Sequence, residues 1–421
     1  MLELHPELQR VWQQLGFNQP TPIQQESFKT LESGDDAVLS APTGSGKTLA
    51  YVLPSLNRVA KSQGTQIMMV LPSQELAAQV GEAIKPWAEA LHLKVVKLIG
   101  GANIKRQMEK LKKGPEIVVG TPGRLIELIN NKKLKTHHLK ILILDEADVL
   151  LDNEHLRTTQ DIIHALPKYR QTILASATMT KTGRQIPEIV TESPQWFEVE
   201  ASSQNNIRYT YLLTPVRKRD DVLRRLAQVE GMQAIVFVRT VADVEKLYQK
   251  LTHAHVPTSY LHRNMAGHSK QEQLQTFKND LTTFLLTTDV AARGMDISDL
   301  PAVVEYDPAE NREQYIHRSG RTGRMGQEGL VMSLVNERSL RDLQQLVPSR
   351  LDQVVLYQGQ LLTPDEREKQ KSESSESTPN KSKKGSSQRK KSGSSNINPE
   401  KKRNKKKNRR RKQKNKGARR K

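Results

Sequence analysis

The sequence contains no cysteine among its 421 residues. This absence excludes disulfide bonds, cysteine-ligated zinc, iron–sulfur clusters and thiol nucleophiles. It is compatible with a reducing compartment. Hydrophobic residues make up 35% of the chain, which is enough for packed cores but low for a wholly globular protein.

Long apolar runs are missing as well. No stretch of about 18 consecutive apolar residues occurs, so we expect no membrane span. The N-terminal stretch MLELHPELQRVWQQLGF carries two acidic residues and no apolar core, which is not the pattern of a secretory signal. We therefore expect a cytoplasmic protein with no membrane partner.

Negative charge is scarce at one end of the chain. Residues 363–421 hold 24 basic and 6 acidic side chains, whereas residues 1–362 hold 43 and 40. From Lys381 onward only Ile397 and Ala418 are hydrophobic. Such a segment cannot bury enough apolar surface to offset its ordering entropy. We therefore predict a disordered Lys/Arg-rich tail over residues 363–421.

The first half of the chain alternates short apolar runs with longer amphipathic segments. The runs are rich in Val, Ile and Leu and do not alternate with polar residues, which is typical of strands buried on both faces. Helices are expected between them, including residues 73–91 and 122–130. The predicted strands are residues 37–40, 67–71, 95–99, 117–119, 141–144 and 172–175.

The second half repeats this pattern after a small, polar segment, ASSQNNI, at residues 201–207. The sequence therefore predicts an α/β protein with two tandem domains and mostly parallel sheets. We place the domains at residues 1–201 and 208–362, with a linker at 202–207. The predicted strands of the second domain are residues 209–213, 234–238, 258–261, 283–286, 303–306 and 329–335.

The segment APTGSGKT at residues 41–48 follows a predicted strand and opens a helix. Gly44 and Gly46 allow a tight turn in which backbone N–H groups point at phosphate oxygens. Lys47 can then reach the β- and γ-phosphates, and the Thr48 hydroxyl can bind Mg²⁺. The alternative is a chance glycine turn, but the strand and helix on either side favour nucleotide binding.

A second polar site follows the apolar run 141–144. It places Asp145 and Glu146 at the carboxyl end of a strand, where open α/β sheets bind ligands. Asp145 can hold Mg²⁺ through water, and Glu146 can orient or deprotonate the attacking water. The alternative is a solvated acidic helix start.

Further segments occur in the order GFNQPTPIQ (16–24), GG (100–101), TPGR (121–124), DEAD (145–148), SAT (176–178), VFVRT (236–240), TTDVAARGMD (287–296) and HRSGRTGR (317–324). Together with the phosphate loop they resemble the DEAD-box RNA helicases of superfamily 2. The short loops favour a bacterial member. The resemblance implies two RecA-like domains and an RNA-dependent ATPase that uses Mg²⁺, held by Thr48 and Asp145.

The carboxamide of Gln24 can pair with N6 and N7 of adenine. The resemblance implies this use, with Phe17 as an aromatic face. The alternative is a polar loop glutamine beside a core phenylalanine. The expected ATP-binding residues are Phe17, Gln24, Ala41, Thr43, Gly44, Ser45, Gly46, Lys47, Thr48 and Asp296.

Arg321 and Arg324 are three residues apart, so both could face one side of a helix. From the second domain they would reach the γ-phosphate as arginine fingers do. The alternative is a generic basic surface patch. The expected catalytic residues are Lys47, Glu146, His317, Arg321 and Arg324.

Ser176 and Thr178 resemble the residues that couple ATP hydrolysis to strand separation; hydroxyls at a strand end are otherwise local caps. The resemblance also implies single-stranded RNA held through its phosphates and 2′-hydroxyls. Two departures concern RNA contacts, because Gln74 and Lys270 stand where the family commonly has Arg. The expected RNA-binding residues are Pro72, Gln74, Gly100, Gly101, Thr121, Pro122, Gly123, Arg124, Arg239, Thr240, Thr287 and Thr288.

The end of the tail, residues 401–421, has 15 basic residues and no acidic one. It favours a non-specific RNA anchor that acts through counterion release. A solubilising tail and a nuclear address are the alternatives. We expect a monomeric RNA helicase that unwinds short duplexes or remodels RNA–protein complexes. Ribosomal precursors and the RNA-decay machinery are both compatible partners. The rival functions are an RNA-annealing protein and a DNA-acting ATPase.

Overall fold

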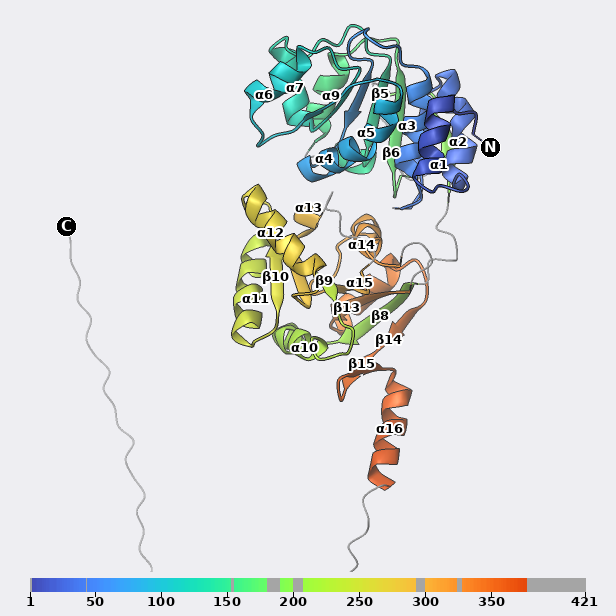
Figure 1. Ribbon diagram of the computed structural model, residues 1–421. Helices are drawn as coiled ribbons and strands as arrows, with labels where there is room; N and C mark the ends of the chain where they lie inside the picture. Colours follow the sequence, from blue (N-terminus) through green and yellow to red (C-terminus); the bar gives the residue numbers. More distant parts are fainter. Residues whose placement is uncertain are drawn as a thin grey trace, which may run out of the picture. The chain divides into compact units, whose positions relative to one another are not determined.

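The computed structural model describes residues 2–42, 44–152, 155–179, 190–199, 207–292, 300–323 and 328–376 (Figure 1). Residues Met1–Lys371 form one compact unit that contains every strand. No helix within the described ranges is long and apolar enough to cross a membrane.

The first sheet has seven parallel strands in the order β3-β4-β2-β5-β6-β1-β7. All six predicted strands are confirmed to within one residue. The seventh, β7, lies at the sheet edge and has a mixed polar and aromatic sequence, which hid it from the apolar pattern. The bounds are β1 Ala37–Ser40, β2 Ile67–Val70, β3 Val95–Leu98, β4 Ile117–Gly120, β5 Ile141–Asp145, β6 Gln171–Ser176 and β7 Gln195–Glu198.

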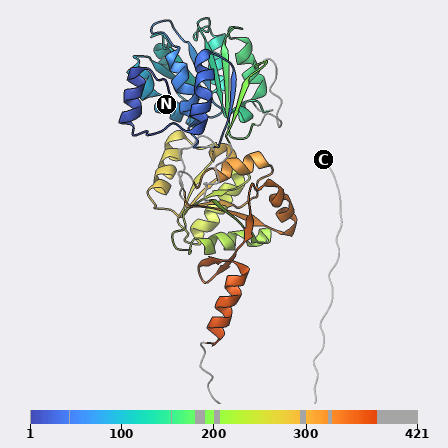
Figure 2. The same cartoon turned by 90° about the vertical axis from the view of Figure 1, so that its right-hand side faces the viewer.

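Helices cover both faces of this sheet (Figures 1 and 2). The helix predicted over residues 73–91 is wrong as a single element. It breaks at Ile84, because Pro86 has no N–H to donate and its ring crowds the preceding turn. The bounds are α1 Pro6–Gln14, α2 Pro22–Ser33, α3 Lys47–Asn57, α4 Gln74–Ala83, α5 Lys85–Ala90, α6 Ile104–Leu111, α7 Pro122–Asn130, α8 Ala147–Leu150 and α9 Leu156–His164.

The second sheet also has seven parallel strands, in the order β10-β11-β9-β12-β13-β8-β14. Its six predicted strands are confirmed to within two residues. The short edge strand β14 was not predicted. The bounds are β8 Ile207–Leu213, β9 Ala234–Phe237, β10 Thr258–Leu261, β11 Phe284–Thr287, β12 Ala302–Glu305, β13 Gly329–Val335 and β14 Leu351–Gln353.

Helices again pack on both faces, over two apolar clusters. The two sheets confirm the predicted fold class of tandem α/β domains. Since all strands within a sheet are parallel, their carboxyl ends share one edge, where ligands are expected. The helix bounds are α10 Arg219–Leu226, α11 Val241–His253, α12 Gly267–Lys278, α13 Asp289–Ala292, α14 Arg312–Ser319 and α15 Glu337–Leu346.

The start of the predicted tail differs from expectation. After the hairpin of β15 (Val355–Tyr357) and β16 (Gln360–Leu362), residues Pro364–Glu376 form helix α16. Thr363 and Glu366 cap it reciprocally, since the Thr363 N–H donates to the Glu366 carboxylate at 2.7 Å and the Glu366 N–H donates to the Thr363 hydroxyl at 3.3 Å. Disorder from residue 363 is therefore wrong for this helix, and residues 377–421 lie outside the described part.

Candidate active site and nucleic-acid interface

The phosphate loop leaves β1 and opens α3 as predicted. The Ala41 N–H donates to the Ser176 carbonyl at 3.1 Å, which anchors the loop to the next strand. Gly46 has φ 86° and precedes the first residue of α3. A Cβ at Gly46 would lie 2.5 Å from Nε2 of Gln24. Only glycine fits both this close approach and the left-handed backbone. Thr43 lies outside the described residues.

Gln24 is 3% exposed, and both ends of its amide are hydrogen-bonded. Its oxygen accepts from the Thr21 N–H at 2.9 Å, and its nitrogen donates to the Gly46 carbonyl at 3.1 Å. To pair with adenine, the Gln24 amide would therefore have to give up its hydrogen bonds to Thr21 and to Gly46 of the phosphate loop. Phe17 is 41% exposed, and its ring centroid lies 5.0 Å from that of Trp12.

The Lys47 side chain is hydrogen-bonded to the backbone of the phosphate loop. Its Nζ donates to the carbonyls of Ala41 and Pro42, the latter at 2.8 Å. One turn further along α3, the Tyr51 hydroxyl donates to Asp145 at 2.9 Å. Burial raises the pKa of Asp145, while Tyr51 and Lys47 act to lower it. Tyr51 was not predicted, because its pattern is that of a core aromatic residue.

Glu146 has φ 52°, and its N–H donates to Oδ1 of Asp145 at 3.0 Å. Its Oε2 and the Oγ of Ser45 are buried without a hydrogen-bond partner among the described residues. Buried polar atoms of this kind are costly unless a ligand or water pairs with them. Thr48, three residues after Ser45, and Asp145, directly before Glu146, can supply oxygen ligands. Together these residues fit a hydrated Mg²⁺ ion and a phosphate chain.

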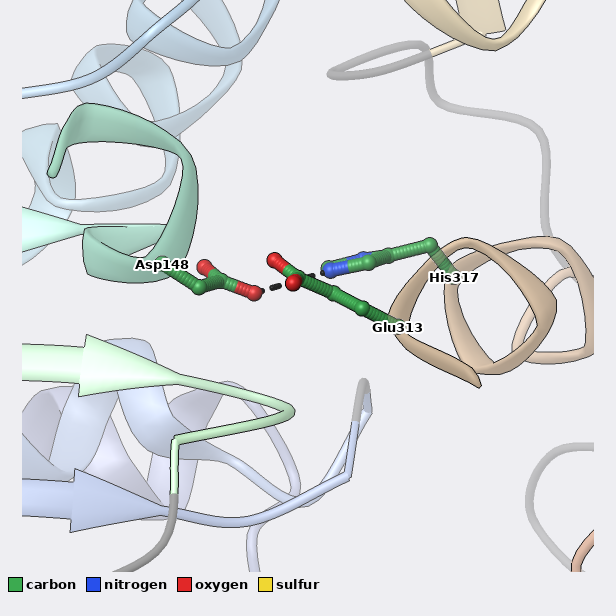
Figure 3. Close-up of side chains that lie close together, drawn as sticks. All are labelled: Asp148, Glu313 and His317. Atoms are coloured by element: carbon green, nitrogen blue, oxygen red, sulfur yellow. Dashed lines mark hydrogen bonds and ion pairs between the residues drawn. The ribbon is translucent and has the colours of Figure 1, made fainter. Parts of the chain in front are cut away.

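Asp148, Glu313 and His317 converge from α8 and α14 (Figure 3). The His317 Nε2 lies 3.0 Å from Oδ2 of Asp148. The candidate ligand atoms of all three residues lie within 4.8 Å of one another. Burial opposes ionisation of Asp148. The charge and hydrogen bond of His317 outweigh it, with help from Thr178 and Glu313, and lower the pKa of Asp148. The predicted residue His317 thus contacts the last residue of DEAD.

Ser176 and Thr178 lie in the turn that follows β6. The Ser176 hydroxyl accepts from the Thr178 N–H at 3.0 Å and from the Met179 N–H at 3.1 Å, so it caps this turn. The Thr178 hydroxyl donates to Asp148. Thr178, Asp148 and His317 therefore form one chain of hydrogen bonds.

Arg321 lies beyond the end of α14, so the expectation that it shares a helix face with Arg324 is wrong. The helix ends at Ser319 because the chain then pairs with another segment: Thr322 forms a parallel bridge with Leu300. Arg321 is close enough to Glu146 for its charge to act on that carboxyl. Arg324 and Asp296 lie outside the described residues.

The expected RNA-binding residues of the first domain lie at the carboxyl ends of the neighbouring strands β2, β3 and β4. Cβ atoms built at Gly100 and Gly101 would lie 2.9 and 3.2 Å from the amide of Gln74. Nη1 of Arg124 donates to the Ala102 carbonyl at 3.4 Å. The structure thus brings together the loops of Pro72, Gln74, Gly100, Gly101, Thr121, Pro122, Gly123 and Arg124.

In the second domain, β9 leads to Arg239 and Thr240, and the neighbouring strand β11 leads to Thr287 and Thr288. Both Thr287 and Thr288 are buried, with exposed fractions of 0% and 6%. Arg239 is exposed, and its Nε lies 3.3 Å from Glu310.

Two tandem RecA-like domains with these loops define the class of the protein. Family models of the DEAD/DEAH box helicase and of the helicase conserved C-terminal domain match residues 21–186 and 217–326. A Bacillus subtilis protein named "Probable ATP-dependent RNA helicase YfmL" is 39% identical over 85% of this chain and 96% of its own length. The DEAD-box ATP-dependent RNA helicase CshC of Bacillus cereus is 36% identical over 82% and 89%.

The chain therefore belongs to the DEAD-box ATP-dependent RNA helicases, and its predicted resemblance to bacterial members is confirmed. Among solved structures, Saccharomyces cerevisiae Dbp5 bound to RNA and ADP BeF3 is similar with a TM-score of 0.75 and 27% identity, over 89% of this chain and 98% of that one. Mss116p bound to single-stranded RNA and AMP-PNP has a TM-score of 0.71 at 24% identity, over 83% and 77%, and supports the fold alone.

Proposed function

We propose that this helicase hydrolyses ATP when RNA binds and locally separates short RNA duplexes or remodels RNA–protein complexes. The supporting observation is that the two domains touch beside both candidate sites. Near the phosphate loop, His317 contacts Asp148 at 3.0 Å. Near the expected RNA loops, Nζ of Lys270 lies 3.0 Å from Oε1 of Glu75, the residue after Gln74. The same arrangement of the two domains therefore places second-domain residues beside the phosphate loop and beside the expected RNA loops.

The site geometry supports the following chemical roles. Lys47 would leave the loop carbonyls to bind the β- and γ-phosphates, and Thr48 and Asp145 would hold Mg²⁺. Bound Mg²⁺ supplies charge neutralisation at the phosphates. Glu146 would accept a proton from the attacking water. Arg321 and Arg324 would stabilise charge that develops on the γ-phosphate.

The direct test measures steady-state ATPase activity with no nucleic acid, with RNA and with DNA of the same sequence, together with strand separation on a short RNA duplex. We expect stimulation by RNA and ATP-dependent strand separation. A folded protein that hydrolyses ATP but does not separate the duplex would contradict unwinding. Equal stimulation by DNA would favour the DNA-acting rival.

The tail is proposed as a non-specific RNA anchor that raises the RNA concentration near the domains. Its positive charge is compatible with ribosomal precursors and with RNA-decay complexes. A monomer in the cytoplasm fits these roles.

A chain that ends at Glu376 keeps every described residue and removes 21 basic side chains. We expect its RNA affinity at low salt to fall by about tenfold or more, with a shallower salt dependence, because fewer counterions are released. ATPase activity at saturating RNA should stay close to that of the full chain. Fluorescence anisotropy at several KCl concentrations measures the affinity.

The matched control keeps the tail length but replaces the Lys and Arg residues of 401–421 with Gln. If this neutral tail binds RNA as tightly as the natural one, the anchor does not act through charge. If the truncated chain loses RNA stimulation at every RNA concentration, the tail supplies the RNA site itself.

Gln74→Arg is expected to strengthen RNA binding by about three- to tenfold and to steepen the salt slope by about 0.7. Gln74 is exposed beside the Gly100–Gly101 loop, so an arginine there would add one phosphate contact. Gln79→Arg, on an exposed position of the same helix, is the control for added charge. Equal gains from both variants would mean that Gln74 does not lie at the RNA site.

A further inference from the structure

The amino ends of the strands in the first sheet form a second edge, opposite to the edge that carries the phosphate loop and the expected RNA loops. Because β3, β4, β2, β5 and β6 are parallel neighbours in that order, the loops that enter them lie side by side along this second edge. We use the name amino-edge surface for four of these loops, which enter β3, β4, β5 and β6. They are residues 91–94, 112–116, 131–140 and 165–170.

Hydrogen bonds join the loops of the amino-edge surface in pairs. Nζ of Lys94 donates to the Lys113 carbonyl at 3.0 Å, which joins the loops before β3 and β4. The Thr136 hydroxyl donates to the Ala165 carbonyl at 3.1 Å, which joins the loops before β5 and β6. The four loops therefore form two bonded pairs, one on each side of the loop that enters β2.

The loop that enters β2 contacts both pairs. On one side, the Ser62 N–H donates to Oε1 of Glu116 at 2.9 Å. On the other side, a Cβ built at Gly64 would lie 3.5 Å from the ring of His138. The amino-edge surface is therefore continuous across five neighbouring strands, which at about 4.8 Å per strand gives a width of roughly 20 Å.

Positive charge is concentrated on the amino-edge surface. Its four loops hold nine Lys or Arg residues and one acidic residue, Glu116. The rest of residues 1–362 holds 34 basic and 39 acidic side chains, so the positive charge of this part of the chain comes from these loops. A local excess of this kind attracts polyanions.

The chain does not neutralise this charge within its described part. Glu116 is 1% exposed, and its two oxygens accept from the backbone N–H groups of Ser62 and Lys94, the latter at 2.8 Å. The lysines of the surface are exposed, and none of them forms an ion pair with another described residue. They are Lys94, Lys112, Lys113, Lys132, Lys133, Lys135, Lys140 and Lys168.

Exposed aromatic rings accompany the lysines. Tyr169 stands between Lys168 and Arg170, and it is 92% exposed. On the neighbouring loop His137 and His138 are exposed as well, with ring centroids 4.0 Å apart. Single-stranded nucleic acids bind through ammonium groups at their phosphates and aromatic rings against their bases. An acidic protein would match the charges but would leave the rings without a role, so the combination favours RNA.

We propose that the amino-edge surface is a second RNA-binding surface of this helicase, which holds a single-stranded segment through lysine–phosphate contacts and stacks a base on Tyr169. The inference rests on RNA as the substrate of the proposed function. Strands β2, β3 and β4 have four residues each, so this surface lies at least about 13 Å from the expected RNA loops. The nucleotides bound here are therefore different from those at the loops, and they add affinity without a part in hydrolysis.

The test compares the full-length protein with a double variant, Lys132→Gln with Lys133→Gln. We expect the affinity for single-stranded RNA at low salt to fall by about tenfold, and the slope of log K against log salt to become shallower by about 1.4, because each phosphate contact contributes about 0.7. Fluorescence anisotropy without nucleotide measures both. At saturating RNA, kcat and KM for ATP should stay within about twofold of wild type, since the surface lies away from the phosphate loop.

The matched control is Arg338→Gln with Arg341→Gln, which removes two exposed positive charges from α15 of the second domain. It should keep the RNA affinity. Tyr169→Ala should lower the affinity by about fivefold or more with an unchanged salt slope, whereas Tyr169→Phe should keep it, because stacking needs the ring and not the hydroxyl. Ultraviolet crosslinking of RNA to the peptide that contains Tyr169 locates the contact directly.

Several results would overturn the inference. Wild-type RNA affinity in the lysine variant would show that RNA does not bind here, and an equal loss in the arginine control would show a general charge effect. If the lysine variant keeps its RNA affinity but loses the binding of polyglutamate that the wild type shows, the surface serves an acidic protein. Wild-type affinity in Tyr169→Ala would exclude base stacking. Because binding is measured without nucleotide, a wild-type ATPase that RNA does not stimulate would contradict the proposed function alone.

Discussion

Replacing Lys47 with alanine is expected to lower kcat/KM for ATP by about 100- to 1000-fold, the loss typical when one preorganised contact to developing charge is removed. Lys47 Nζ lies inside the loop, bonded to the carbonyls of Ala41 and Pro42. Steady-state ATPase assays with saturating RNA measure the effect.

RNA binding measured without nucleotide should be unchanged in Lys47→Ala, because the expected RNA loops follow other strands. Lys61→Ala, an exposed lysine beyond the end of α3, is the control for loss of a positive charge. A Lys47→Ala protein that still separates or anneals RNA strands at the wild-type rate would favour the RNA-annealing rival. Parallel loss in Lys61→Ala would indicate a general charge effect.

The central strands could be predicted because their burial dominates their composition. In β1, β2, β4 and β5 every residue is buried, so each reads as an apolar run, which ends in Ser40 in β1 and in Asp145 in β5. The edge strands β7 and β14 are half exposed and carry mixed residues, so this signal was absent. The break at Ile84 was readable from Pro86, whose missing N–H interrupts the helix ladder.

In the candidate site, too, the residues that stand in local motifs could be predicted, and the contacts that depend on packing could not. Lys47 and Asp145 stand in local strings whose residue types and spacing carry the chemistry. The contacts of Tyr51 with Asp145 and of Glu313 with Asp148 join residues far apart in the chain. A local sequence pattern contains no information about contacts between residues that are distant in the chain. Arg318 lies inside the segment HRSGRTGR, yet its ion pairs with Asp289 and Glu305 arise only from the packing of α14.

Glu146→Gln is expected to lower RNA-stimulated kcat by about 100- to 10,000-fold, the usual worth of a positioned general base. KM for ATP should change little, because the amide keeps the shape of the side chain. Glu89→Gln, on the exposed surface of α5, is the control, since its ion pair with Lys85 contributes little. Single-turnover hydrolysis with prebound ATP separates chemistry from binding. A variant that keeps wild-type kcat would exclude Glu146 as the base.

The pH dependence gives the same residue an independent signature. Burial raises the pKa of Glu146 above its ordinary value of 4.5, and Asp145 and Asp148 add to the shift while His317 and Arg321 oppose it. The base must be ionised, so kcat should fall as pH drops through this raised pKa, at a higher pH than an exposed glutamate would allow.

Ionisation of Glu146 should affect stability and activity in opposite directions. A carboxyl group whose pKa is raised by folding stabilises the fold below its unfolded pKa, and this contribution is lost as pH rises through the folded pKa. At neutral pH the ionised Glu146 therefore costs stability, and Glu146→Gln should raise Tm while it removes activity. Near pH 4 the two Tm values should converge, because the wild-type carboxyl group is then protonated as well. A Tm difference that stays constant between pH 4 and 8 would mean that the carboxyl group is not held in a charge-disfavouring site.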